Sequence, residues 1–161
     1  MRKHVKTIQS IKDQSEVIKL LGLKTQNGNP EVKGSPFAVI TTNFSKKPYY
    51  GQVKHNSFSI TKNSNLIPLP VILDGFITAK NNETKIILEK RPIWFGYLWI
   101  RVIPVLGVIG FNTILIVQSN PVPLELFLIL NSFFVLMFSI MFFIYSNGEK
   151  KFIKRVLNDL K

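Results

Sequence analysis

The 161-residue sequence contains no cysteine. This absence excludes disulfide bonds, cysteine-ligated metal sites, thiol catalysis and acylation on cysteine. Histidine is almost as scarce, and His4 and His55 belong to no H-x-x-x-H or H-E-x-x-H spacing that would hold a metal ion. The sequence therefore predicts neither a metal site nor a bound cofactor.

Acidic residues are also few, since nine Asp and Glu stand against 21 Lys and Arg and leave a formal net charge of +12. These carboxylates are scattered, and the chain has no G-x-S-x-G, Walker or dinucleotide-binding glycine pattern. We therefore predict no catalytic residues and no enzyme activity. Asp74 stands beside Gly75 between apolar neighbours, and we interpret it as a strand-face or bulge residue rather than a catalytic one.

Such an excess of basic residues is also found in nucleic-acid-binding proteins. In this chain, however, the basic residues are scattered and no recognised nucleic-acid-binding motif is present. We therefore expect no nucleic acid among the partners.

Two long apolar runs dominate the second half of the sequence. Residues 93–117 read "IWFGYLWIRVIPVLGVIGFNTILIV" with Arg101 as the only charge, and residues 126–145 read "LFLILNSFFVLMFSIMFFIY" with none. A helix of about 20 residues crosses a hydrocarbon core of about 30 Å. Two buried helices of a soluble protein are the alternative, but the rest of the chain is too small to cover both on all sides. We predict a transmembrane helical hairpin over residues 92–146, with spans at about 93–117 and 124–145.

Positive charge is placed unevenly around these runs. Every Lys and Arg except Arg101 lies before residue 92 or after residue 147, and the connection "QSNPVPLE" at residues 118–125 has none. The positive-inside rule then predicts a multi-pass protein of the bacterial cytoplasmic membrane with both termini in the cytoplasm. No apolar segment directly follows the basic N-terminal residues, so a cleaved signal peptide is not expected. Anionic lipid headgroups are the expected membrane partners of the basic residues.

Residues 1–91 are predicted to form a cytoplasmic α+β domain. A capping box of Asp13 and Glu16 begins a short helix in "IKDQSEVIKLLGLKT", and Gly22 offers a left-handed end to it. Residues 3–10 form a weaker strand candidate. The turn-rich stretch at residues 26–36 is predicted to be a loop.

Short β-like runs follow from residue 37. After the run at residues 37–44, residues 49–61 are typical of a hairpin turning near His55 and Asn56, and residues 69–91 of a longer hairpin turning at residues 80–83. Both hairpins contain glycine, one residue, and then a β-branched residue before an Asn-containing turn, which favours an antiparallel β-meander. Alternate residues are expected to face a core against the N-terminal helix, namely Val71, Leu73, Ile77, Ile86 and Leu88.

The last segment, residues 147–161, is predicted to be a separate basic amphipathic helix. Ser146 and Glu149 form a second capping box, and an apolar face contains Phe152, Ile153, Val156, Leu157 and Leu160. Two placements remain open: on the inner leaflet, which the flanking cations slightly favour, or packed on the soluble domain. The residues predicted to lie at the membrane interface are Lys150, Lys151, Lys154 and Arg155.

The start of the first apolar run predicts a second interfacial group. Pro92 fits the first turn of a helix, and 25 residues from Ile93 would rise about 37 Å, which exceeds the hydrocarbon core. The first residues of the run then lie among the headgroups, where aromatic side chains gather. This belt consists of Trp94, Tyr97 and Trp99.

Arg101 lies about one turn beyond this belt. We interpret it as a marker of depth that extends toward the cytoplasmic phosphates, with Pro104 bending the helix just after it. The reading as a buried functional charge is the alternative.

Small and polar residues are spaced along both apolar runs. Such residues let helices approach closely and hydrogen-bond to each other within a membrane. The predicted helix-packing residues are Gly107, Gly110, Asn112, Asn131, Ser132 and Ser139.

The stretches "YYGQVKHNSFSI", "NLIPLPVILDGFI" and "ETKIILEKRPIWFGYLWI" resemble an uncharacterised family of small bacterial membrane proteins over about residues 49–117. The matching residues are Gly51, Val53, Asn56, Phe58, Leu69, Pro70, Val71, Ile72, Gly75, Ile77, Thr84 and Pro92. The resemblance implies a β-rich cytoplasmic part followed by two transmembrane helices, and it implies no activity. The sequence departs from the family at "KNSNLIP", where relatives have aromatic and basic residues. A looser similarity to membrane-tethered bacterial PH-like modules concerns architecture alone.

These features predict a non-enzymatic integral membrane protein whose basic cytoplasmic domain binds a partner protein or the inner-leaflet surface. The alternatives are a small oligomeric channel or transporter accessory, a toxin-immunity membrane protein, and an enzyme acting on lipid. The identity of a partner protein and homo-oligomerisation are left open.

Overall fold

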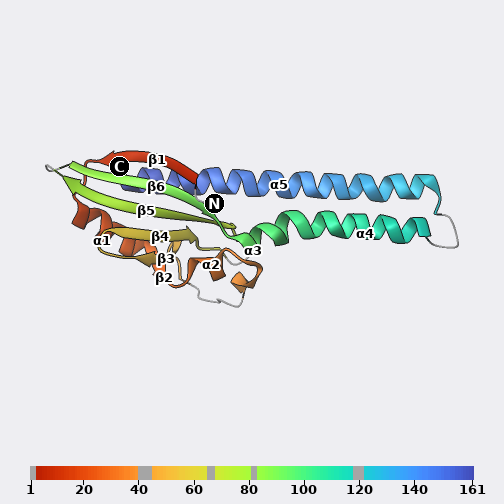
Figure 1. Ribbon diagram of the computed structural model, residues 1–161, viewed down its shortest axis with the longest axis horizontal. Coiled ribbons are helices and arrows are strands. Elements are labelled where there is room, and N and C mark those ends of the chain that lie inside the picture. Colours follow the sequence, from red (N-terminus) through yellow and green to blue (C-terminus); the bar gives the residue numbers. More distant parts are fainter. Residues whose placement is uncertain (1–2, 40–44, 65–67, 81–82, 118–121) are drawn as a thin grey trace.

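The computed structural model describes residues 3–39, 45–64, 68–80, 83–117 and 122–161. A six-stranded sheet lies at one end of the molecule, and two long apolar helices extend from it side by side (Figure 1). The elements, in chain order, are β1 (Lys3–Ser10), α1 (Gln14–Lys24), β2 (Thr25–Asn27), α2 (Pro30–Lys33), a 3₁₀ turn (Pro36–Val39), β3 (Tyr49–Val53), β4 (Ser57–Lys62), β5 (Val71–Lys80), β6 (Glu83–Pro92), α3 (Trp94–Tyr97), a π-helical turn (Leu98–Val102), α4 (Ile103–Val117) and α5 (Leu124–Leu160).

The sheet has the strand order β1-β6-β5-β4-β3-β2. Strands β3 to β6 form the predicted antiparallel meander, and β1 adds a further antiparallel strand beside β6. Strand β2 pairs in parallel with β3, so the sheet is mixed rather than purely antiparallel. The prediction of an α+β fold is confirmed, and the strand candidate at residues 3–10 is β1.

Both hairpin glycines lie opposite the central strand β4. Gly51 pairs with Ile60 and has a φ of 154°, and a Cβ atom there would lie 2.0 Å from the Ser59 carbonyl oxygen. Gly75 pairs with Phe58, whose ring covers the place that a Cβ atom would occupy. The glycine shared by the two hairpins therefore has a physical reason, which is close approach from β4.

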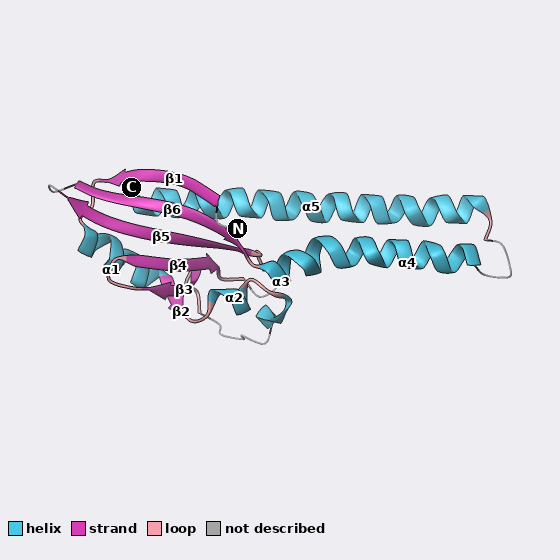
Figure 2. Ribbon diagram, in the orientation of Figure 1, coloured by secondary structure: helices cyan, strands magenta, loops and turns pink. Residues whose placement is uncertain are grey.

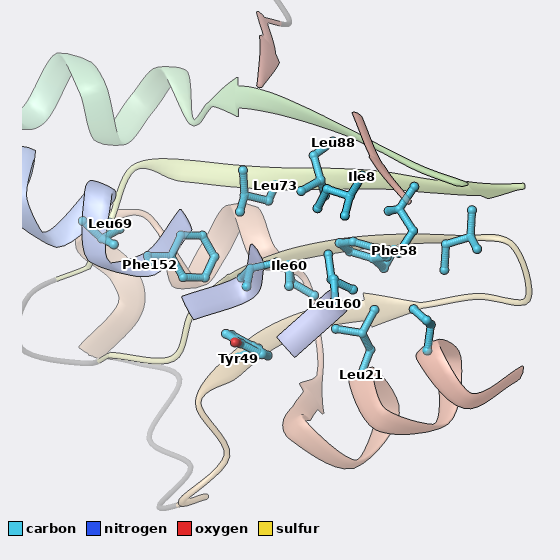
Figure 3. Packing of buried hydrophobic residues seen from close by; sticks show 14 residues of the cluster. Ile8, Leu21, Tyr49, Phe58, Ile60, Leu69, Leu73, Leu88, Phe152 and Leu160 are labelled. Carbon is cyan, nitrogen blue, oxygen red and sulfur yellow. The ribbon is translucent and has the colours of Figure 1, made fainter. Parts of the chain in front are cut away.

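One face of the sheet is covered by α1 together with the C-terminal part of α5 (Figure 2). Figure 3 shows Phe152 and Leu160 of α5 among strand residues such as Ile60. The predicted inward-facing residues of β5 and β6 are buried, and four of them join this core cluster. The cluster consists of Ile8, Val17, Leu21, Tyr49, Phe58, Ile60, Leu69, Leu73, Ile77, Ile86, Leu88, Phe152, Val156 and Leu160.

The C-terminal segment corrects two predictions. Helix α5 runs without a break from Leu124 to Leu160, so residues 147–161 are not a separate helix and Ser146 and Glu149 do not cap one. Gly148 interrupts nothing; a Cβ atom there would lie 3.3 Å from Leu69, so the glycine permits close packing. The apolar face of this segment packs on the sheet, and the placement of that face on the leaflet, which we slightly favoured, is wrong.

Polar contacts hold the end of α5 in place. Ser10 Oγ donates a hydrogen bond to the Leu160 carbonyl oxygen at 2.6 Å, and Lys12 Nζ donates to the Asp159 carbonyl oxygen at 3.4 Å. The last carbonyl groups of a helix have no partner within the helix, so these side chains at the end of β1 complete the hydrogen bonding there.

Three local predictions differ from the structure. Asp13 does cap α1, accepting from the Glu16 amide, but Gly22 lies inside the helix, which ends at Lys24. The predicted loop at residues 26–36 contains β2 and α2, and Asn29 caps the start of α2. Residues 37–39 belong to a 3₁₀ turn rather than a strand, and the rest of that predicted run, residues 40–44, lies outside the described residues.

Pro92 is the last residue of β6, where it pairs with Val71, and the helix begins at Trp94. Our placement of Pro92 in the first helical turn was therefore wrong. Proline is tolerated at the end of this strand because its missing N–H removes little from the ladder.

Candidate functional site

The junction between the sheet and the two long helices is held by close backbone contacts. The Ile93 amide donates to the Pro70 carbonyl oxygen at 2.9 Å, and the Ile93 side chain is buried. A Cβ atom at Gly96 would lie 2.6 Å from the Gly34 carbonyl oxygen, so α3 lies directly against the segment after α2. This contact fixes where the first apolar helix leaves the sheet.

Exposed aromatic side chains surround the junction. The exposed fractions are 69 % for Trp94 and 50 % for Trp99, and the Trp94 ring stacks on Tyr97 with centroids 6.1 Å apart. Two further members were not predicted: Phe37 and Phe95, whose rings stack at 5.6 Å and are both exposed. Phe95 lies within the stretch of the predicted belt but is not among its predicted members. Phe37 belongs to residues 37–44, which the sequence pattern predicts to be a strand.

Arg101 occupies the π-helical turn that follows α3. Its guanidinium lies 4.8 Å from the centroid of the Tyr97 ring and 5.4 Å from that of Phe142 on α5. Both distances are typical of cation–π contacts. Pro104 explains the wide turn, because proline cannot donate a hydrogen bond to the carbonyl of Ile100 and its ring clashes there.

The basic residues of α5 that are predicted to lie at the interface are all exposed, on the segment that buries Phe152: Lys150, Lys151, Lys154 and Arg155. Of these, Lys150 lies at the junction, whereas Lys151 and Arg155 line a separate cavity beside β3 and β4. Lys150 follows Tyr145 by five residues, a rise of about 7.5 Å along the helix. Lys150 is therefore brought to the same end of the long helices as the predicted aromatic belt.

A cavity of about 330 Å³ opens between these two groups. Its charged lining residues are Lys90, Arg101, Glu149 and Lys150, and Lys90 Nζ lies 2.5 Å from Glu149 Oε1. The remaining lining residues are Leu69, Pro70, Val71, Pro92, Tyr97, Ile100, Tyr145 and Ser146.

A second cavity of about 280 Å³ continues between α4 and α5. It shares Ile100, Arg101 and Tyr145 with the first cavity, and its other lining residues are Pro104, Val105, Phe138, Met141 and Phe142. Because the two cavities share three lining residues, we treat them as one groove, charged at the sheet and apolar between the helices. We call it the junction groove, with the cavity of about 330 Å³ as its upper cavity and the cavity of about 280 Å³ as its lower cavity.

Two of the predicted helix-packing residues contact each other. Asn112 and Asn131 hydrogen-bond each other between α4 and α5. Around Gly107 and Gly110 a Cβ atom would meet nothing within 4 Å, so these glycines mark no close approach. Ser132 and Ser139 are exposed, and the Ser139 hydroxyl donates to the carbonyl of Val135 in its own helix.

A second polar cluster joins the far end of α5 to the domain. Asp159 accepts hydrogen bonds from Lys24 Nζ at 2.6 Å and from Tyr49 Oη at 2.5 Å. Burial acts to raise the pKa of Asp159, but these two hydrogen bonds, together with the positive charges of Lys24 and Arg155, outweigh it and leave the pKa below its ordinary value. Burial, reinforced by the Asp159 carboxylate, raises the pKa of Tyr49. This arrangement binds helix to sheet and offers no free acid or base.

Asp74 fits the interpretation as a strand residue. Its carboxylate is buried and accepts hydrogen bonds from Ser59 Oγ at 2.6 Å and Arg91 Nε at 3.1 Å. Arg91 also pairs with Glu31 at 2.6 Å, so Asp74 belongs to a network that links β5 and β6 to α2. Over the described part of the chain, no three His, Asp or Glu residues gather in a way that would hold a metal ion.

No protein-family model, curated protein or solved structure matches this chain. The resemblance to small bacterial membrane proteins thus stays a prediction. The junction combines exposed aromatic rings, cations and an amphipathic groove.

Proposed function

We propose that the protein is a non-enzymatic, two-span protein of the bacterial cytoplasmic membrane. Helices α3–α4 and α5 cross the bilayer, both termini lie in the cytoplasm, and the α+β domain rests on the inner leaflet, where it binds anionic headgroups. The protein belongs, on this proposal, with the small bacterial membrane proteins that its sequence resembles.

The observation that carries the proposal is the meeting of aromatic and cationic side chains at the junction. Trp94, Trp99, Arg101 and Lys150 lie where the apolar helices leave the sheet. Aromatic rings and snorkelling cations prefer the headgroup region of a bilayer. A bilayer surface at the junction would place all four in their preferred surroundings.

The apolar helices supply independent support. Both are long and apolar enough to cross a membrane, and no residue of the most apolar window of either helix is buried within the chain. An apolar surface of this extent is rarely left in water by a soluble monomer. Lipid is the simplest cover, because each helix can then satisfy its own backbone hydrogen bonds.

The polar residues between the helices do not support the channel alternative. The amides of Asn112 and Asn131 satisfy each other inside one chain, whereas a pore needs polar groups that face a water-filled space. We therefore keep membrane-surface binding as the proposed function.

The absence of cysteine makes a topology experiment simple, because every introduced cysteine is the only thiol. Glu125→Cys reports the connection between the helices, and Lys54→Cys reports the turn between β3 and β4, where both side chains are exposed. In intact bacterial spheroplasts, a membrane-impermeant maleimide should label Glu125→Cys at once and Lys54→Cys only after permeabilisation. Labelling of both from the same side would overturn the proposal.

A further inference from the structure

We propose that the junction groove binds one glycerophospholipid with an anionic headgroup, its phosphate between Arg101 and Lys150 and an acyl chain between α4 and α5. This inference rests on the proposed function, because only a membrane-inserted protein presents the groove to lipid. It adds a defined site to what would otherwise be diffuse attraction to the leaflet.

The charge of the upper cavity selects an anion. Lys90 and Glu149 form an ion pair at 2.5 Å and cancel each other. Among the residues that the structure describes, neither Arg101 nor Lys150 takes part in an ion pair, so the lining keeps two positive charges. A phosphate diester bound there would meet two cations and no unpaired carboxylate.

The same lining disfavours zwitterionic lipid. A choline or ethanolamine group needs an anion or an aromatic cage close to the phosphate. Glu149, the one carboxylate among the described residues that line the upper cavity, is already engaged by Lys90, and the Tyr97 ring is already occupied by the guanidinium of Arg101. A headgroup with no positive charge is therefore the better match.

Arg101 is held in a position that serves both parts of the groove. It lines both cavities, and its contacts with Tyr97 and Phe142 bridge the two chain segments that form the walls. Tyr145 also lines both cavities. The headgroup position and the chain position therefore meet at two residues that each combine an apolar body with a polar end.

The lower cavity fits an acyl chain. Apart from Arg101 and the Tyr145 hydroxyl, its lining is apolar, and it lies between helices whose surfaces are exposed. A free phosphate has no apolar part that could fill this cavity, and a soluble peptide would have to enter the bilayer to reach it. Charge above and hydrocarbon below together identify a membrane lipid as the occupant.

Lipid retention by the purified full-length chain tests the site. The chain in mild detergent is mixed with phosphatidylglycerol and phosphatidylcholine of the same acyl chains, and retained lipid is counted by native mass spectrometry. We expect one phosphatidylglycerol per chain in preference to phosphatidylcholine. Lys150→Gln should lower that retention about fivefold, as expected for the loss of one cation near anionic lipid.

Lys19→Gln is the matched control for charge. Lys19 is an exposed lysine of α1 that lines neither cavity of the junction groove, so this variant should retain lipid as the unchanged chain does. An equal loss in Lys150→Gln and Lys19→Gln would indicate diffuse attraction and overturn the site.

Val105→Trp tests the acyl-chain half without changing any charge. Val105 is 51 % exposed and lines the lower cavity, so a bulky ring there should displace the chain and lower lipid retention at least fivefold. Ile109→Trp, at a similarly exposed residue outside the groove, should have no such effect. Unchanged retention in Val105→Trp, or full competition by inorganic phosphate, would show that no lipid occupies the groove.

Resistance of the chain to alkaline carbonate extraction separates the two proposals. A chain extracted from membranes contradicts the proposed function itself. A chain that stays in the membrane yet retains no anionic lipid contradicts the junction groove alone.

Discussion

Asn112 and Asn131 donate hydrogen bonds to each other's side-chain oxygens at 2.9 and 2.8 Å. Each amide also donates to the carbonyl four residues earlier in its own helix, Val108 for one and Phe127 for the other. The pair therefore satisfies its donors completely and fixes the register of α4 against α5. In a bilayer, where no water can replace these bonds, the pair becomes the main polar contact of the hairpin.

Loss of this pair should loosen the hairpin. We expect Asn112→Leu and Asn131→Leu each to destabilise the association of α4 and α5, because either change leaves the other amide without its partner. In a double-mutant cycle, the coupling free energy should be about 0.6–2 kcal/mol. Unfolding of the full chain in detergent micelles measures this coupling.

Ser139→Ala serves as the control for that cycle. Its hydroxyl donates to Val135 within α5, so the change should leave the interaction of the two helices unaltered. A coupling near zero between Asn112 and Asn131, or an equal loss in Ser139→Ala, would contradict the role of the pair.

The C-terminal part of α5 should contribute to the stability of the sheet domain. Leu160 is fully buried in the core, and we expect Leu160→Ala to lower the free energy of unfolding by about 2–5 kcal/mol. Urea unfolding of the full chain in detergent tests this value. The exposed residue Lys154 provides the comparison, because Lys154→Ala should stay within about 0.5 kcal/mol of the unchanged chain. A Leu160→Ala variant with unaltered unfolding would show that this segment does not belong to the core.

Two glycine substitutions should change the stability of the domain in opposite directions. Gly22 lies inside α1 with nothing within 4 Å of a Cβ atom, so Gly22→Ala should stabilise the domain by about 0.5–1 kcal/mol. Gly51→Ala should destabilise it by at least about 1 kcal/mol, because φ is 154° and a Cβ atom would collide with the Ser59 carbonyl. Thermal unfolding of the two variants checks both signs, and a shift in the same direction for both would contradict the assigned geometry.

The cluster of Tyr49 and Asp159 should limit stability at both ends of the pH range. The lowered pKa of Asp159 stabilises the fold above its ordinary value of about 4, and this contribution is lost as pH falls through the folded pKa. The raised pKa of Tyr49 stabilises the fold below its ordinary value of about 10, and this contribution is lost as pH rises beyond it.

Tyr49→Phe separates the two effects. The variant should lose the decline of stability above about pH 10 and keep a weaker decline below about pH 4, because Lys24 still donates to Asp159. Urea midpoints measured across the pH range test this expectation. An alkaline decline of the same size in Tyr49→Phe would assign it to another group.

Much of the fold could be predicted because its signals are local and repeated. The alternation of Leu73, Ile77 and Ile86 indicated half-buried strands, and uninterrupted apolar runs indicated the long helices. Asp13 marked the start of α1 correctly, since an N-cap depends on only a few neighbouring residues.

The remaining elements depend on contacts between distant residues. Strand β2 has three residues and no apolar alternation, and it exists because it pairs with β3. The residues around Gly148 carry a local signal for a helix start, but packing on Leu69 and the sheet keeps α5 continuous. A sequence pattern records neither kind of contact.

The candidate site could be predicted in part from the sequence. Arg101 and Lys150 could each be assigned to an interface from the sequence, one by its place in an apolar run and the other by its amphipathic surroundings. The sequence could not predict that these two residues lie around one groove. This arrangement follows from the contact of Ile93 and Gly96 with the sheet domain and from the continuity of α5. The stacking of Phe37 on Phe95 is a further long-range contact without a sequence signal.

The depth of the native tryptophans tests the central claim most directly. The chain has two tryptophans, Trp94 and Trp99, and both lie at the junction, so fluorescence of the unmodified protein reports its position in the bilayer. In vesicles containing phospholipids with quenchers at defined depths, we predict strong quenching by labels near the headgroups and weak quenching by labels near the chain ends. Stronger quenching by the deep labels, or none at any depth, would contradict the placement of the junction at the membrane surface.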